Sequence, residues 1–239
     1  MKKLTITVII LVQILTLTAQ NHEAGGWAFL NIKKKVGEGF SLALRGEYRC
    51  RDNFKRSDEY LVRLMGEYKA CDYLEVGVGY DFCNKLKVAE VKDGLSIDKW
   101  TQKNHRGLVE AKGHYSLYRW TFQLRERYVY AYAMDADVAA RDDMGMYVTC
   151  KKDGGWSHVL RHKPGVSYSL WKGIFKPFVE VELYNRIDKG FDLQQVHLHV
   201  GTTIRFDAVN SLKVYYVMQD KISEKRFVHT VALEYSISL

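Results

Sequence analysis

Residues 40–51 read FSLALRGEYRCR, and apolar and polar side chains alternate through this stretch. Alternate residues of an extended chain share a side. One side carries the apolar set, which comprises Phe40, Leu42, Leu44, Tyr48 and Cys50. The other side carries the polar set, which comprises Ser41, Arg45, Glu47, Arg49 and Arg51. In a water-soluble fold the apolar side is buried, whereas in a membrane barrel it faces lipid and the charges line an interior.

The same alternation recurs along the chain. It covers residues 60–69, 74–82, 120–127, 175–183, 196–206 and 231–239, and no convincing amphipathic helix interrupts it. Period-two alternation without helical segments is typical of strands. The sequence therefore predicts an all-β fold, an antiparallel up-and-down transmembrane β-barrel of about 10–12 strands.

The strand count leaves one question open. Counting from a first strand near residues 27–34 gives eleven strands, whereas bacterial single-chain barrels normally have an even number. Either residues 27–34 do not form a full wall strand, or a twelfth strand lies within residues 144–152.

The N-terminal stretch has the features of an export signal. It reads MKKLTITVIILVQILTLTAQ, in which Lys2 and Lys3 precede an uncharged apolar run that ends in small residues. The run falls short of the ~20 apolar residues that a spanning helix needs. We therefore expect a secretory signal peptide over residues 1–19, cleaved near Ala19, and a single outer-membrane β-barrel domain over residues 20–239.

The predicted connections alternate in length. Short turns fall near residues 35–39, 70–73, 116–119, 170–173 and 207–210. Longer, more polar connections fall near residues 52–58, 83–104, 133–155, 187–193 and 220–225. Short turns at one rim and long loops at the other are typical of outer-membrane barrels.

The composition of the two strand faces favours charges inside the barrel. The polar face carries charges of both signs and few groups that fill a dry core, and the apolar face has Tyr and Trp near strand ends, as at membrane interfaces. The alternative is a periplasmic lipocalin-like binding barrel with its apolar face inward. Ten or more strands would enclose more apolar interior than side chains fill. The predicted lumen-lining residues are Arg45, Glu47, Arg49, Arg63, Glu67, Glu75, Asp81, Arg106, Glu110, Arg125, Arg127, Arg161, Glu180, Glu182, His197, His199 and Arg205.

The overall charge excess is modest. Removing the two lysines of the signal peptide leaves 34 of the 36 basic residues, against 28 acidic ones. No basic helix or run indicates a nucleic-acid partner. The expected partners are outer-membrane lipid and, during biogenesis, the barrel-assembly machinery.

Near-balanced charges on the predicted lumenal face favour salt bridges that close a narrow lumen. We expect a non-enzymatic protein of uncharacterised role, structural or ligand-binding, whose long loops contact external ligands. The alternative is a narrow anion-preferring channel for small solutes such as sugar acids, because a lumen rich in arginine attracts anions.

Four residues form the strongest candidate cluster. If the hairpin around Lys189 is symmetric, Glu182 lies opposite His197 and Glu180 lies opposite His199, all on the lumenal face. These side chains suit a divalent metal or a general base. Because His-x-His is common on strands, the sequence favours instead a cross-strand ion-pair ladder, with no metal and no cofactor.

Two serine–histidine pairs are the nearest candidates for a nucleophile and its base. They are Ser157 with His158, and Ser167 with His162. Residues separated by an odd number of positions point to opposite faces of a strand, so neither pair meets without a bulge. We expect no catalytic residues.

The four cysteines provide a test of the topology. Cys50, Cys83 and Cys150 lie at or beyond the long-loop rim, and Cys71 lies in a short turn at the opposite rim. A barrel ~25 Å tall keeps Cys71 out of reach of the others. Any disulfide therefore joins two of Cys50, Cys83 and Cys150.

Several segments together resemble a known family. They are GEYRCR at 46–51, VGVGYDF at 76–82, FQLRERYVY at 122–130, FVEVELYNR at 178–186 and the alternating C-terminal strand. In their order they resemble the bacterial outer-membrane barrels grouped as domain of unknown function 2490. The resemblance implies a barrel fold in the outer membrane and brings no catalytic set. One departure is Leu239, which stands where a terminal aromatic is usual in barrel-assembly signals.

Overall fold

The computed structural model describes residues 23–87, 89–92, 95–188, 190–222 and 226–239, so the predicted signal peptide lies outside the described residues. The described chain is almost entirely β-strand, with one 3-10 turn at Trp171–Gly173. None of its helical segments is long and apolar enough to cross a membrane. The strands are β1 Glu23–Lys35, β2 Phe40–Arg51, β3 Arg56–Cys71, β4 Leu74–Lys87, β5 Glu90–Lys92, β6 Leu95–Ile97, β7 Trp100–Leu117, β8 Trp120–Ala133, β9 Ala136–Arg141, β10 Tyr147–Lys152, β11 Gly155–Tyr168, β12 Phe175–Arg186, β13 Asp192–Arg205, β14 Asn210–Lys221 and β15 Arg226–Ser238.

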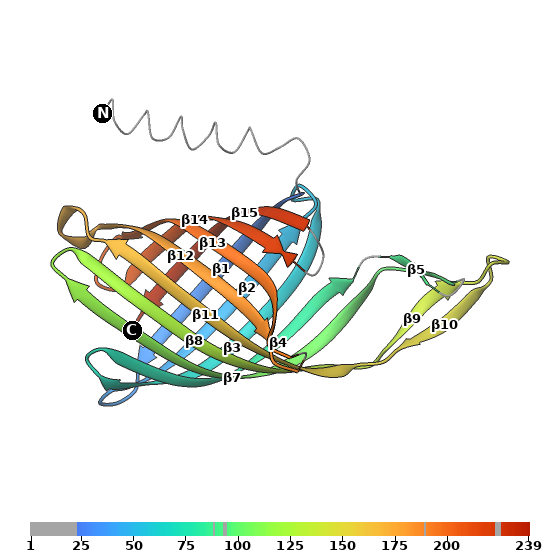
Figure 1. Cartoon of the computed structure of the whole chain (residues 1–239), viewed down its shortest axis with the longest axis horizontal. Coiled ribbons are helices and arrows are strands. Elements are labelled where there is room, and N and C mark those ends of the chain that lie inside the picture. The colour runs from blue at the N-terminus through green and yellow to red at the C-terminus, as the bar shows by residue number, and fades with distance from the viewer. Residues whose placement is uncertain (1–22, 88, 93–94, 189, 223–225) are drawn as a thin grey trace, which may run out of the picture.

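Eleven of these strands close into a barrel, in the order β1-β15-β14-β13-β12-β11-β8-β7-β4-β3-β2 (Figure 1). Neighbours in sequence pair antiparallel around the wall. The predicted all-β fold and the expected range of 10–12 strands are therefore confirmed.

The barrel closes through a parallel seam. β1 pairs antiparallel with β2 and parallel with β15, from Glu23 beside Val228 to Lys33 beside Ser238. Both routes to an even strand number are wrong, because residues 27–34 belong to a full wall strand and residues 144–152 contribute β10 to a separate sheet. An odd number of up-and-down strands makes the first and last run in the same direction, so their seam is parallel.

Connections of different length gather at opposite rims. The short-turn rim holds the connections that follow β1, β3, β7, β11 and β13, and the long-loop rim holds the others, in the predicted order along the chain. The connections β2–β3 and β12–β13 are shorter than expected, since the flanking strands extend to Arg51, Arg56, Arg186 and Asp192.

The two longest connections pair with each other beyond the long-loop rim. The connection between β4 and β7 supplies β5 and β6, and the connection between β8 and β11 supplies β9 and β10. Together they form a second sheet in the order β10-β9-β6-β5, which projects from the barrel (Figure 1). Ile97, Val138 and Ala140 bury one another there. We call these four strands the loop sheet.

The wall strands expose most of their large apolar side chains and bury many charged ones. On β3, Val62 and Leu64 are 55% and 56% exposed, whereas Arg63 and Glu67 are 7% and 5% exposed. Side chains on one strand point alternately to the two faces of the wall. The charged face of FSLALRGEYRCR therefore points into the barrel, and its apolar face points outward.

Candidate functional site

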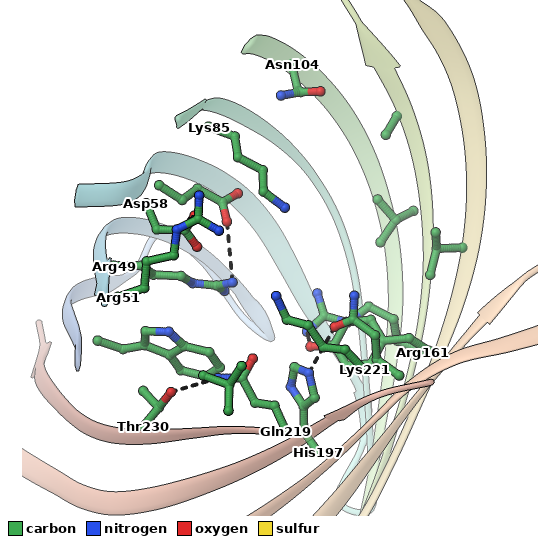
Figure 2. A pocket seen from close by; sticks show the side chains of 18 of the residues that line it. Arg49, Arg51, Asp58, Lys85, Asn104, Arg161, His197, Gln219, Lys221 and Thr230 are labelled. Carbon is green, nitrogen blue, oxygen red and sulfur yellow. Dashed lines mark hydrogen bonds and ion pairs between the residues drawn. The ribbon is translucent and has the colours of Figure 1, made fainter. Parts of the chain in front are cut away.

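The interior of the barrel contains two cavities. The long-loop cavity has a volume of about 270 Å3 and extends toward the rim that carries the loop sheet. The short-turn cavity has a volume of about 390 Å3 and lies toward the opposite rim. Figure 2 looks into the long-loop cavity, where Arg49, Arg161 and His197 point toward the centre from different sides of the wall.

A row of stacked side chains lies between the two cavities. Trp27, Arg49, Arg161 and Tyr184 line both cavities. The Arg49 guanidinium carbon lies 4.4 Å from the Trp27 ring centroid, and that of Arg161 lies 4.4 Å from the Tyr184 centroid. The His197 ring contacts both aromatic rings, with centroid distances of 4.6 Å to Tyr184 and 6.1 Å to Trp27. We call these five residues the waist, which runs across the interior from β2 to β11.

The two glutamates of β12 are held by cations from several strands. Glu182 Oε1 accepts hydrogen bonds from Arg125 Nη2 at 2.7 Å and from Arg161 Nε at 2.9 Å. Glu180 lies 2.6 Å from Lys163 Nζ and 3.1 Å from Lys213 Nζ. Charges removed from water need such partners, because an unpaired buried charge is strongly destabilising.

The opposite wall is paired in the same way. Arg63 donates to both oxygens of Asp81, at 2.6 and 2.7 Å. Glu110 pairs with Arg127 and lies 2.9 Å from Lys112 Nζ. The bidentate geometry of the Arg63–Asp81 pair adds both strength and direction.

The predicted lumen-lining residues fall into three groups. The fully buried ones are Glu47, Arg63, Glu67, Asp81, Glu110, Arg127, Glu180, Glu182, His197 and His199. The partly buried ones are Arg45, Arg49, Glu75, Arg106, Arg125 and Arg161. Arg205 lies apart from them, exposed at the end of β13, and lines neither cavity.

Sequence reasoning did not identify several residues of the interior. Trp27 and Tyr184 belong to the waist, Lys33 pairs with Glu67 at 2.6 Å, and Glu59 pairs with Arg106 at 3.0 Å. Extending the period-two pattern by a few residues would have placed all of them on the inward face. Glu59 lies an even number of positions from Arg63, and Lys33 lies an even number of positions from Trp27, so each pair shares one face of its strand.

The predicted register of the histidine cluster is confirmed. Glu182 lies opposite His197, and Glu180 lies opposite His199. The ion pairs differ from the expected cross-strand ladder. Glu180 pairs with lysines and not with His199, and the His199 Nε2 atom lies 3.6 Å from Glu182 Oε2. His197 Nε2 lies 3.1 Å from Gln195 Oε1. Each histidine is 3% exposed.

The two serine–histidine pairs stay on opposite sides of the wall. Ser157 lines the long-loop cavity, whereas His158 lies 2.6 Å from the Tyr128 hydroxyl on the outer face. His162 also faces outward and pairs with Glu126 of β8. Sequence reasoning did not identify this outward ion pair, which lies among apolar strand residues. Glu126 shares its strand face with Leu124 and Tyr128, which belong to the outward apolar set.

The described cysteines are free thiols, so the expected disulfide pairing stays a prediction. Cys50 and Cys83 lie in β2 and β4 toward the long-loop rim, Cys150 lies in the loop sheet, and Cys71 ends β3 at the short-turn rim. Cys83 is buried and Cys71 is exposed.

The base of the loop sheet contains a long-range hydrogen bond. The Gly154 N–H donates to a carboxylate oxygen of Asp135 at 2.6 Å. This bond lowers the pKa of Asp135, and the nearby Lys151 ammonium adds to the effect. The two connecting segments on either side of β9 and β10 are thus joined where they leave the barrel.

Comparison with known protein families gives a match. The family described as Protein of unknown function (DUF2490) matches residues 24–227, which is most of the chain. No curated protein matches the sequence.

Proposed function

The chain belongs to the DUF2490 family of proteins of unknown function, and we propose that it is an exported, non-enzymatic outer-membrane β-barrel with a closed, charged lumen and a structural or ligand-binding role. The outward face supports the membrane location. Among its most exposed side chains are Val78 at 63%, Leu64 at 56% and Val109 at 56%. An apolar band around a closed barrel is suited to lipid, because closure leaves no unpaired strand edge.

The waist is the observation that best supports a closed lumen. Its stacked rings and guanidinium groups separate the two cavities, and the carboxylates around it are paired with arginine and lysine. A charged side chain held in such pairs does not move aside without losing its partners. Ligands therefore enter a cavity from one rim and do not cross to the other.

The second candidate is a narrow anion-preferring channel for small solutes such as sugar acids. Among the described residues that line the short-turn cavity, nine are arginine or lysine and four are glutamate. A surplus of fixed positive charge attracts anions. If the waist opened, this positively charged lining would form an anion-selective path through the barrel.

A periplasmic lipocalin-like barrel fits less well. Such a barrel holds its apolar face inward. Here the interior holds Asp81 at 1% and Glu182 at 2% exposure, beside a buried aromatic cluster of Trp27, Phe29, Phe178 and Tyr215. Most of the large apolar side chains of the wall strands lie outside.

Fractionation and electrophoresis test the location and the barrel. We expect the mature chain in the outer-membrane fraction, with faster migration when the sample is left unheated. Recovery in the soluble periplasmic fraction would contradict the proposal.

Planar-bilayer recording separates the two membrane functions. The closed barrel predicts no steady conductance from purified, heat-modifiable protein. Steady anion-selective conductance would favour the channel.

A further inference from the structure

The inward faces of β12 and β13 bring three possible metal ligands together at the waist. They are Glu182, His197 and His199, and one ligand atom of each lies within 4.8 Å of the others. All three side chains are between 2% and 3% exposed. The neighbouring strands hold them in fixed register, since Glu182 is directly opposite His197.

Three of the four imidazole nitrogens of this cluster lack hydrogen-bond partners among the described residues. Within the described part of the chain, none is found for His197 Nδ1 or for either ring nitrogen of His199. The distance of 3.6 Å from His199 Nε2 to Glu182 Oε2 is longer than a hydrogen bond. Buried polar atoms of folded proteins are nearly always satisfied, so three such nitrogens in one place point to a ligand-binding site.

The surroundings of the cluster fix the orientation of its members. Gln195 holds one ring nitrogen of His197 at 3.1 Å and leaves Nδ1 without a partner. Glu182 Oε1 accepts from Arg125 and Arg161, whereas Oε2 accepts from the Tyr184 hydroxyl at 3.3 Å. Metal-binding imidazole and carboxylate groups are characteristically held through their other polar atoms in this way.

The two arginines also limit which metal fits. Their positive charges oppose any dication at Glu182, so binding must come from coordination by imidazole and not from charge alone. Calcium and magnesium prefer sets of oxygen ligands, which this cluster does not offer. Zinc accepts two imidazoles and one carboxylate and leaves a fourth position for water.

We infer that Glu182, His197 and His199 bind a transition-metal dication of the zinc type, through one ring nitrogen of each histidine and one carboxylate oxygen. The fourth position opens to the interior, because Glu182 and His199 line the short-turn cavity and His197 lines the long-loop cavity. The ion would join β12 and β13 at the waist. This inference deepens the proposed lumenal binding role and rests on it.

The test uses Zn2+ as the probe with the untagged, refolded mature chain in detergent. Alkylation of the thiols beforehand removes the cysteines as competing ligands. Equilibrium dialysis should show one Zn2+ per chain. The double substitution His197→Gln with His199→Gln should lower the affinity by more than about 100-fold.

His114→Gln is the matched control, because His114 also lines the short-turn cavity but lies outside the cluster. It should leave zinc binding unchanged. Co2+ should give the visible absorption of a four-coordinate site in the wild type and in this control, and not in the double variant. Heat-modifiable migration shows that each variant folds. If the double variant does not fold, Glu182→Gln replaces it, with the same loss expected.

Zinc binding that survives the histidine substitutions would overturn the inference. So would a folded wild-type chain that binds neither Zn2+ nor Co2+. A chain that binds zinc and also conducts ions would refute the closed lumen and keep the metal site, whereas a closed barrel without zinc binding would do the reverse.

Discussion

Arg161 of β11 and Glu182 of β12 form an ion pair on one carboxylate oxygen, which accepts a hydrogen bond from Arg161 Nε at 2.9 Å and lies 2.7 Å from Arg161 Nη2. The same guanidinium stacks on Tyr184 and donates to its hydroxyl at 2.7 Å. One arginine thus ties an ion pair to an aromatic ring at the boundary between the two cavities. Arg161 therefore connects the ion pairs of the interior to the stacked side chains of the waist.

Removing the rings of the waist should open the lumen. We expect Trp27→Ala combined with Tyr184→Ala to give steady conductance in a planar bilayer, because both rings lie between the two cavities. The matched control is Trp156→Ala combined with Tyr60→Ala, which removes the same ring types from the outer face, where both are 55% exposed. The control should stay closed. A folded waist variant that does not conduct would show that other side chains close the barrel.

The Arg63–Asp81 pair should be a large contributor to stability. Asp81→Asn leaves the buried Arg63 guanidinium without its countercharge, and breaking such a pair costs about 3–5 kcal/mol of the free energy of unfolding. Urea unfolding in detergent micelles measures the loss. Asp143→Asn, at an exposed position of the loop sheet connection, should change it by less than about 0.5 kcal/mol. Equal effects of the two substitutions would contradict a tightly paired interior.

Gly201 should tolerate no side chain. A Cβ there would lie 2.3 Å from the Val214 carbonyl oxygen and 2.4 Å from the Tyr215 Cβ. Tyr215 stacks on His199 at a centroid distance of 5.7 Å, so the clash would also displace the histidine cluster. Gly201→Ala should therefore lower the unfolding midpoint and weaken zinc binding. Gly46→Ala, at an open position of β2, is the control and should do neither.

The sequence predicted the interior where the pattern is local. The alternation in residues 40–51 gave the inward face of β2, and hairpin symmetry placed Glu182 opposite His197. The local pattern did not predict the partners of Glu180. Lys213 comes from a strand two positions away in the barrel, and it reaches Glu180 only through the curvature of the wall. The parallel seam also escaped prediction, since pairing of β1 with β15 joins the two ends of the chain and has no local signal.

Acid should loosen the base of the loop sheet. The folded pKa of Asp135 is lowered by the Gly154 N–H, so this contribution to stability is present above the unfolded pKa of about 3.9 and is lost as the pH falls through the folded value. Protection of the Gly154 amide against hydrogen exchange, corrected for its intrinsic rate, should fall over that range. Asp135→Asn keeps a carbonyl acceptor and should remove the pH dependence. Protection lost at a pH above 3.9 in the wild type would contradict the lowered pKa.

The proposed membrane barrel places apolar side chains against lipid and charged ones toward the lumen. Nitroxide labels placed singly at Val62, Arg63, Leu64 and Met65 of β3 test it most directly, in protein reconstituted into lipid vesicles. These neighbours alternate between exposed and buried positions, at 55%, 7%, 56% and 4% exposure. We expect labels at Val62 and Leu64 to collide readily with oxygen dissolved in lipid and rarely with a water-soluble nickel complex, and labels at Arg63 and Met65 not to do so. High nickel accessibility at Val62 and Leu64 would mean that the apolar outer face contacts water, and would refute the membrane-spanning arrangement.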